Sequence, residues 1–117
     1  MTGTAEILRV KSHPVGLWTV LELAGELDVA GLPALHRRVD EICAVCAPPR
    51  LVIDMTAVTF MDSCGLSGLV RCWQRVGGLQ GRFVLVGLRP RVVRVLDITG
   101  MRRAFETYDS LEEFTRS

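Results

Sequence analysis

Alternating strand-like and helix-like segments run through most of this 117-residue chain, and this alternation limits the fold more than any other feature. Short apolar runs predict three strands, at Leu17–Leu23, Leu51–Ile53 and Phe83–Val86. After each run, apolar residues recur every three to four positions, which predicts helices that begin near Asp28, Ser63 and Pro90. Strands joined through helices lie parallel, because such crossover connections are right-handed and return the chain in the same direction.

Both ends of the chain add smaller elements. An apolar segment at Ile7–Val10 precedes the turn-like sequence His13-Pro14-Val15-Gly16, which predicts a hairpin with the strand that follows. Near the C-terminus, a short strand-like stretch precedes Ser110 and Glu113, whose spacing is a capping box and predicts a small helix. We therefore expect a single α/β domain over residues 1–117, with a mixed central sheet of four to five strands and four helices mainly on one face.

Composition excludes several classes of function. Fourteen basic and thirteen acidic side chains give a formal net charge of +1, and no aromatic residues are interleaved with the arginines, so direct nucleic-acid binding is not expected. The chain has no signal-like start and no run of eighteen apolar residues, which predicts a cytoplasmic protein without a membrane span. Its four cysteines lack the paired spacing of the usual zinc modules, so neither a metal nor a cofactor is expected.

The loops that follow the predicted strands are expected to share one edge of the sheet, because the carboxyl ends of parallel strands and the N-termini of the next helices lie together. Three loops are predicted to reach this rim: Gly25–Asp28, Met61–Gly65 and Gly87–Pro90. Ser63 stands where the second helix begins, so its hydroxyl is expected to act as the N-cap. The free N–H groups and the positive end of the helix dipole would also accommodate a phosphate on Ser63.

Two motifs on this predicted rim resemble those of the anti-sigma factor antagonist family, whose members are STAS-domain proteins. One is Phe60-Met61-Asp62-Ser63-Cys64-Gly65-Leu66, which follows Leu51-Val52-Ile53-Asp54, and the other is Gly25-Glu26-Leu27-Asp28. The later segment Val95-Leu96-Asp97-Ile98-Thr99-Gly100 also falls where the family expects it, so the resemblance covers nearly the whole chain. The departure is Cys64, because relatives commonly have serine or threonine at this position.

The resemblance implies a regulator that is switched by phosphorylation and is not itself an enzyme. Ser63 matches the family's phosphorylated serine, and the surface recognised by the partner would include Asp28, Asp62, Cys64, Gly65 and Leu66. When unphosphorylated, the chain would bind an anti-sigma factor with serine kinase activity, and a sigma factor of the stress response or sporulation would be released. Phosphorylation by that partner would end the association, and a serine phosphatase would restore it.

Other interpretations of the same residues stay open. The chain could be a STAS scaffold or a ligand-sensing module in a stress-signalling complex, although it lacks a Gly-rich phosphate loop for a nucleotide. A two-component receiver domain is similar in length and alternation, with Asp54 as its phosphoacceptor, but the only lysine is Lys11, far from the last strand. Asp54 is therefore expected to shape the turn out of its strand. A helix N-terminus promotes thiol oxidation, so a redox role for Cys64 is a further alternative.

Overall fold

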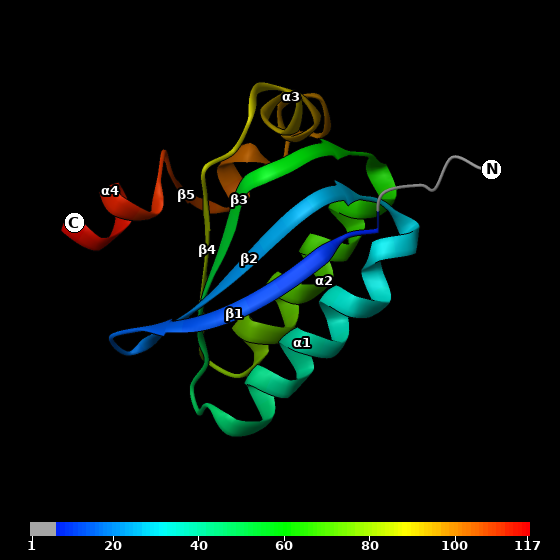
Figure 1. The fold of residues 1–117 in the computed structure, drawn as a ribbon. Helices are drawn as coiled ribbons and strands as arrows, with labels where there is room; N and C mark the ends of the chain where they lie inside the picture. Colours follow the sequence, from blue (N-terminus) through cyan, green and yellow to red (C-terminus); the bar gives the residue numbers. More distant parts are fainter. Residues whose placement is uncertain (1–6) are drawn as a thin grey trace.

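Five strands form one mixed sheet in the computed structural model, which describes residues 7–117 (Figure 1). Strands β1 (Arg9–Val15) and β2 (Trp18–Leu27) make an antiparallel hairpin. The sheet continues in chain order with parallel strands, β3 (Arg50–Met61), β4 (Arg82–Val86) and β5 (Glu106–Tyr108). The predicted mixed sheet of four to five strands is confirmed.

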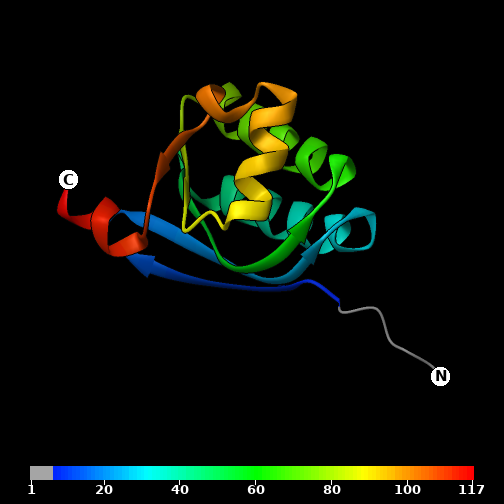
Figure 2. The same cartoon turned by 90° about the horizontal axis from the view of Figure 1, so that it is seen from above.

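Three helices cover one face of this sheet, namely α1 (Leu32–Val45), α2 (Ser63–Gly78) and α3 (Pro90–Thr99) (Figures 1 and 2). Each helix contributes fully buried side chains to the main core, such as Leu35 from α1, Leu69 from α2 and Leu96 from α3. These side chains pack against residues of the sheet such as Ile53, which has no exposed surface. The predicted arrangement, with the helices mainly on one face, is therefore confirmed.

The fourth helix, α4 (Leu111–Arg116), lies on the opposite face of the sheet (Figure 1). Its Phe114 packs with Val20, Val52 and Val84, which are all fully buried in a second, smaller core. The predicted cap is present, because Ser110 Oγ accepts a hydrogen bond from the Glu113 N–H at 3.0 Å. The apolar run of β3 is thus covered on both faces, as its lack of alternation indicates.

Strand β3 is much longer than the predicted Leu51–Ile53, because it runs on to Met61. The polar residues after Ile53 resemble a turn, but the structure accommodates them in an irregular stretch of strand with shifts in its pairing to β2. The prediction that Asp54 shapes the turn out of the strand is wrong. Its Oδ1 accepts hydrogen bonds from Thr56 N at 3.0 Å and Thr56 Oγ1 at 2.6 Å, within the strand itself.

Other predicted boundaries shift by a few residues. The hairpin turn is shorter than predicted, since Val15 pairs with Trp18 and Gly16 takes a positive φ of 60°. Helix α1 begins only after a 3-10 turn, η1 (Val29–Gly31), and a second such turn, η2 (Arg102–Ala104), follows α3. The predicted end of α3 at Gly100 is confirmed by a left-handed φ of 74°.

Candidate functional site

The carboxyl ends of β2 and β3 lie side by side and form the candidate site, called here the rim. Leu27 pairs with Met61 at the end of the two strands, so the residues that follow, Asp28 and Asp62, begin neighbouring loops. These loops lead into η1 and α2, which contact each other. Two of the three loops predicted to share the rim are therefore adjacent.

The third predicted loop, Gly87–Pro90, does not reach the rim. Strand β4 ends with Val86 opposite Asp54, seven residues before the end of β3, which places the loop about 20 Å further back along the strand. The loop packs instead at the middle of β3, where Arg89 Nε donates a hydrogen bond to Thr56 O at 2.7 Å. The unequal lengths of β3 and β4 explain why this prediction is wrong.

The N-cap of α2 is Asp62 and not Ser63. The Asp62 backbone is extended, and its Oδ1 accepts a hydrogen bond from Gly65 N at 2.8 Å, while Leu66 N donates to Asp62 O at 3.0 Å. Ser63 becomes the first residue of the helix and is exposed. In the described part of the chain its hydroxyl makes no hydrogen bond, so it is available at the surface.

Asp28 caps the turn in the neighbouring loop in the same way. Its Oδ1 accepts a hydrogen bond from Ala30 N at 3.1 Å and so holds the 3-10 turn η1. Both aspartates that were predicted on the docking surface therefore also fix the backbone of the rim. Each carboxylate keeps a second oxygen, Oδ2, that could contact a partner.

Gly65 and Leu66 are buried, which corrects the expectation that they lie on the docking surface. Leu66 is only 6% exposed and packs in the main core. A Cβ on Gly65 would lie 2.0 Å from Leu27 O, so glycine is needed here because α2 passes directly over the end of β2. The accessible surface of this motif consists of Ser63 and Cys64, with Asp62 half-buried.

Two apolar side chains near the rim were missed by the sequence analysis. Val29 in η1 is 67% exposed, and Phe60, two residues before Asp62, is 38% exposed. Phe60 could have been found from strand alternation, since Met61 points into the core and its neighbour must point away. No pattern in the sequence marks Val29.

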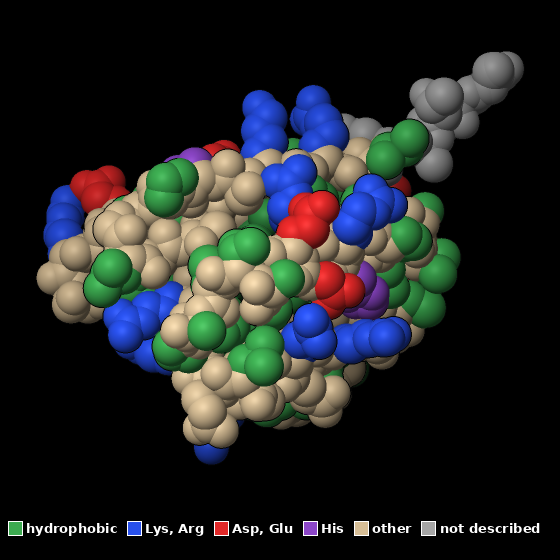
Figure 3. Space-filling view, turned by 90° about the horizontal axis from the view of Figure 1, so that it is seen from below, with side chains coloured by type: hydrophobic (Ala, Val, Ile, Leu, Met, Phe, Trp, Pro, Cys, Tyr) green, Lys and Arg blue, Asp and Glu red, His purple; other side chains and the backbone are tan. Residues whose placement is uncertain are grey.

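The rim is acidic, whereas the helical layer carries mixed charge. The segments at 25–31 and 59–68 contain Glu26, Asp28 and Asp62 but no lysine or arginine. On the face seen from below, to which α1 and α2 contribute, acidic side chains are interspersed among basic ones (Figure 3). The two helices are joined by an ion pair, with Arg75 Nε of α2 at 2.8 Å from Asp40 Oδ1 of α1. A cationic or neutral partner surface would suit the rim better than an anionic one.

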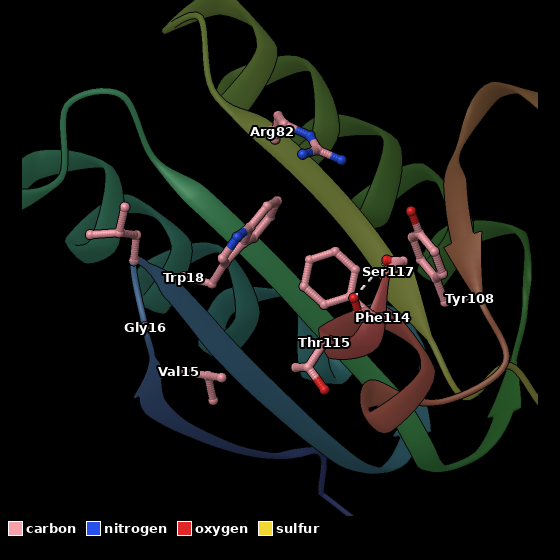
Figure 4. A pocket seen from close by; sticks show the side chains of 9 residues that line it. Val15, Gly16, Trp18, Arg82, Tyr108, Phe114, Thr115 and Ser117 are labelled. Atoms are coloured by element: carbon pink, nitrogen blue, oxygen red, sulfur yellow. Dashed lines mark hydrogen bonds between the residues drawn. The ribbon is translucent and has the colours of Figure 1, made fainter.

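A hollow of about 460 Å³ lies far from the rim, between the β1–β2 hairpin and α4 (Figure 4). Phe114 packs edge to face with Trp18, with ring centroids 4.8 Å apart, and also with Tyr108 at 5.1 Å. The Arg82 guanidinium lies 5.0 Å from the centre of the Trp18 ring and is paired with Glu106. Because these groups satisfy one another, this aromatic cluster is best explained as the means by which α4 is held to the sheet.

The cysteine thiols in the described part of the chain are not arranged for catalysis or for metal binding. Cys43 and Cys72 are buried, and burial raises the pKa of the Cys72 thiol to about 12, so it stays protonated at neutral pH. Cys64 is exposed at the rim. Within residues 7–117, no three histidine, cysteine or acidic side chains gather in a way that could hold a metal ion. Among the described helices, none has both the length and the apolar character needed to cross a membrane.

Comparisons with known proteins show what the whole chain is similar to. Residues 7–114 match the family described as STAS domain. The anti-sigma-B factor antagonist of Listeria monocytogenes is 34% identical over 84 residues, which are 72% of this chain and 73% of the relative. The anti-sigma-F factor antagonist RsfB of Mycobacterium tuberculosis is 30% identical over 94 residues, covering 80% of this chain and 75% of the relative. A crystal structure of an anti-sigma factor antagonist from Mycobacterium paratuberculosis superimposes with a TM-score of 0.83 at 27% identity, over 99% of this chain and 97% of that one.

Proposed function

Because the chain belongs to the STAS-domain family, among the anti-sigma factor antagonists, we propose that it switches a partner by phosphorylation of Ser63. Unphosphorylated, it binds an anti-sigma factor that has serine kinase activity, so that a sigma factor is released. The same kinase then phosphorylates Ser63, the complex separates, and a serine phosphatase restores the binding form. The observation that carries this proposal is the exposed Ser63 hydroxyl, left free because Asp62 caps the helix.

The electrostatics of the rim support a switch of this kind. A phosphate on Ser63 adds about −1.5 to −2 charges at neutral pH, beside Asp62 and the neighbouring loop of Asp28. The first turn of α2 tolerates this charge, because its N–H groups and the helix dipole favour an anion there. A partner surface complementary to the neutral hydroxyl would instead lose contacts and face a concentrated negative charge.

The packing beneath the rim supports a change in the surface without a change in the fold. Gly65 and Leu66 are buried, and the Asp62 cap keeps the first turn of α2 in place whatever the state of Ser63. The docking surface in this proposal comprises Ser63 and Cys64, with Asp28 and Asp62, and the exposed Val29 and Phe60 add apolar area beside them.

All catalysis in this cycle belongs to the partners. Anti-sigma factor antagonists are regulators and not enzymes, so in this proposal the chain supplies the acceptor hydroxyl, while ATP and its magnesium are bound by the kinase. The proposed setting is the cytoplasm, without direct contact to nucleic acid or membrane. A receiver-like role is not favoured, because Asp54 is engaged with Thr56 inside the sheet.

Phosphoryl transfer to Ser63 is tested by intact-mass measurement. The chain is used to recover its anti-sigma factor from the native cytoplasm, and the recovered complex is incubated with ATP and magnesium. We expect one added phosphoryl group on the parent chain and none on Ser63→Ala. The matched control is Ser67→Ala, because Ser67 is also exposed and lies one turn further along α2. Phosphorylation of Ser63→Ala, or loss of it in Ser67→Ala, would contradict the assignment.

A further inference from the structure

A hollow of about 170 Å³ lies between α1 and α2. Its floor is apolar, because it is lined by the buried Val39 and Cys72. Its walls consist of two polar side chains from each helix, spaced four residues apart and so on one helix face: His36 and Asp40 from α1, Arg71 and Arg75 from α2. Figure 3, to which both helices contribute, shows a histidine beside acidic and basic side chains. The hollow therefore brings together polar groups that are eight residues and more from Ser63.

Close packing of the two helices fixes the end of the hollow that lies toward the rim. A Cβ on Gly68 would lie 2.2 Å from Leu32 Cδ2, so α1 and α2 are in direct contact there. The Gly68 carbonyl also accepts a hydrogen bond from His36 Nε2 at 3.3 Å, which ties the imidazole of α1 to α2. In the described part of the chain the other ring nitrogen, Nδ1, makes no hydrogen bond. The ring is thus held in place with one nitrogen left for a ligand.

The charges in the hollow favour an anion. Arg75 Nε is paired with Asp40 Oδ1 at 2.8 Å, so this arginine is oriented and its charge is compensated. Within residues 7–117, Arg71 makes no ion pair with a carboxylate. The floor adds no negative charge, because the buried Cys72 thiol stays protonated. Two arginines against one aspartate leave one positive charge, which an anionic ligand would neutralise.

The size of the hollow and its donors suit a phosphate group. The volume of 170 Å³ is below the range of about 300–1,000 Å³ that is typical of sites for drug-sized molecules. At about 30 Å³ for each water it would hold about six waters, which is enough for the phosphorus and four oxygens of a phosphate. Arg75 keeps its terminal NH₂ groups and Arg71 all its donors, and guanidinium groups match phosphate oxygens in geometry. Two such groups suit a dianion better than a singly charged carboxylate.

We propose that this hollow binds the phosphate group of a small molecule, with Arg71 and Arg75 donating to its oxygens and His36 beside them. This helical phosphate site is separate from the Ser63 hydroxyl, because Arg71 lies eight residues, or about 12 Å, further along α2. A phosphate bound there would join α1 to α2 through their side chains. The chain would then bind a small ligand on its helical layer in addition to the protein contact proposed at the rim.

The site is tested by titrating the full ¹⁵N-labelled chain with inorganic phosphate and with glycerol phosphate, at neutral pH and constant ionic strength, while amide chemical shifts are followed. We expect saturable shifts that are largest at residues 36–40 and 71–75, and none with glycerol. Tighter binding of glycerol phosphate would identify a phosphate monoester as the ligand, whereas equal or weaker binding would identify free phosphate. Both results support the site. Acetate should bind at least about fivefold more weakly than phosphate, because it carries a smaller charge.

Variants in the two helices test which side chains bind the phosphate. Arg71→Gln should weaken phosphate binding by about fivefold or more, because a charge-assisted contact is lost while the exposed position leaves the fold unchanged. Arg37→Gln is the matched control, since Arg37 is exposed beside His36 on α1 but does not line the hollow. The remaining amide shifts of each variant report whether the fold is retained.

Ser63→Ala should bind phosphate like the parent chain, so this test can fail or succeed independently of the phosphorylation proposal. Three results would overturn the helical phosphate site. The first is the absence of saturable shifts at residues 36–40 and 71–75, or equal shifts at the arginines of α3. The second is equal weakening of binding by Arg71→Gln and Arg37→Gln, and the third is acetate binding as tight as that of phosphate.

Discussion

The two halves of β3 differ in almost every physical respect, although they form one continuous strand. The first half, Arg50–Asp54, lies between β2 and β4, and its Leu51, Val52 and Ile53 have no exposed surface. The second half, Thr56–Met61, has a strand on one side only, and most of its side chains are exposed. One half therefore stabilises the sheet, while the other extends from it and carries the rim.

This difference shows how one small domain can combine a rigid fold with an adjustable surface. A few close contacts hold the rim to the core. The main ones are the close packing of Gly65 against Leu27 O and the hydrogen bond with which Asp62 caps α2. The surface that these contacts position contributes little to the core. In the proposed switch, a charge added to Ser63 would therefore have little effect on the buried half of the strand.

The largest contrast is expected in thiol reactivity. Cys64 is exposed beside the second half of β3, whereas Cys72 is buried in the core with a pKa raised to about 12. At pH 8 only about one Cys72 thiol in 10⁴ is ionised, and this fraction rises tenfold with each pH unit up to about 12. Timed alkylation at pH 8 with mass mapping should show Cys64 reacting much faster than Cys72, because Cys64 is exposed while Cys72 is both buried and protonated. Similar rates at the two thiols would show that the core opens readily.

The next largest effect is expected when the free energy of unfolding is compared between variants in the two halves of β3. Ile53→Ala should lower the free energy of unfolding by about 2–5 kcal/mol, because it leaves a cavity in a fully packed core. Phe60→Ala should cost only about 1–2 kcal/mol, because Phe60 is already 38% exposed and has less buried surface to lose. Urea denaturation of both variants measures the difference. Equal losses would mean that the second half is as important to stability as the first.

Gly65→Ala tests the contact that joins the two regions. The added methyl group would lie 2.0 Å from Leu27 O, so α2 must shift, at a cost of about 2–3 kcal/mol. The matched control is Gly77→Ala on the same helix, where the added methyl group meets nothing within 4 Å and should be neutral or stabilising. Thermal unfolding of the two variants distinguishes these outcomes. A neutral Gly65→Ala would show that α2 does not need to pass so close to β2.

Loss of either of the two helix caps should lower the free energy of unfolding moderately. Asp62→Ala removes the hydrogen bond to Gly65 N at the start of the 16-residue helix α2, which should cost about 1 kcal/mol. Asp28→Ala removes the corresponding bond in the three-residue turn η1, and we expect about half of that loss. Chemical denaturation at neutral pH compares the two. If Asp28→Ala lowers the free energy of unfolding more than Asp62→Ala does, the rim is held in place mainly by η1 and not by α2.

The smallest effect on the free energy of unfolding is expected at the proposed phosphorylation site, Ser63. Ser63→Ala removes a hydroxyl that is exposed and makes no hydrogen bond in the described structure. The free energy of unfolding should therefore change by less than about 0.5 kcal/mol. The same measurement on Ser63→Asp should also give a small change, because a carboxylate suits the first turn of a helix. A large loss in either variant would assign Ser63 a structural role.

The two halves of β3 also mark how far the sequence could predict the structure. The buried half was predicted correctly, because Leu51–Ile53 is a continuous apolar run. The second half was missed, because its irregular pairing removes the period of two on which strand prediction depends. Nothing local shows that β4 ends opposite Asp54, so the loop at Gly87–Pro90 was wrongly placed on the rim.

The sequence marks the residues of the candidate site but not their geometry. Its motifs point to Ser63 and both aspartates, whose roles remain a proposal, but the sequence does not show whether Asp62 or Ser63 caps α2, since both are good capping residues. The burial of Gly65 and Leu66 could not be predicted either, because it depends on how closely α2 crosses the end of β2. Such crossings are set by tertiary packing and not by local propensity.

The most direct test of the account is to measure the affinity of the chain for its anti-sigma factor before and after complete phosphorylation of Ser63, together with the unfolding midpoint of both forms. We predict an affinity at least about tenfold weaker after phosphorylation, with an unfolding midpoint changed by only a few degrees. Equal affinities, or a loss of affinity that accompanies loss of the fold, would contradict a switch confined to the surface.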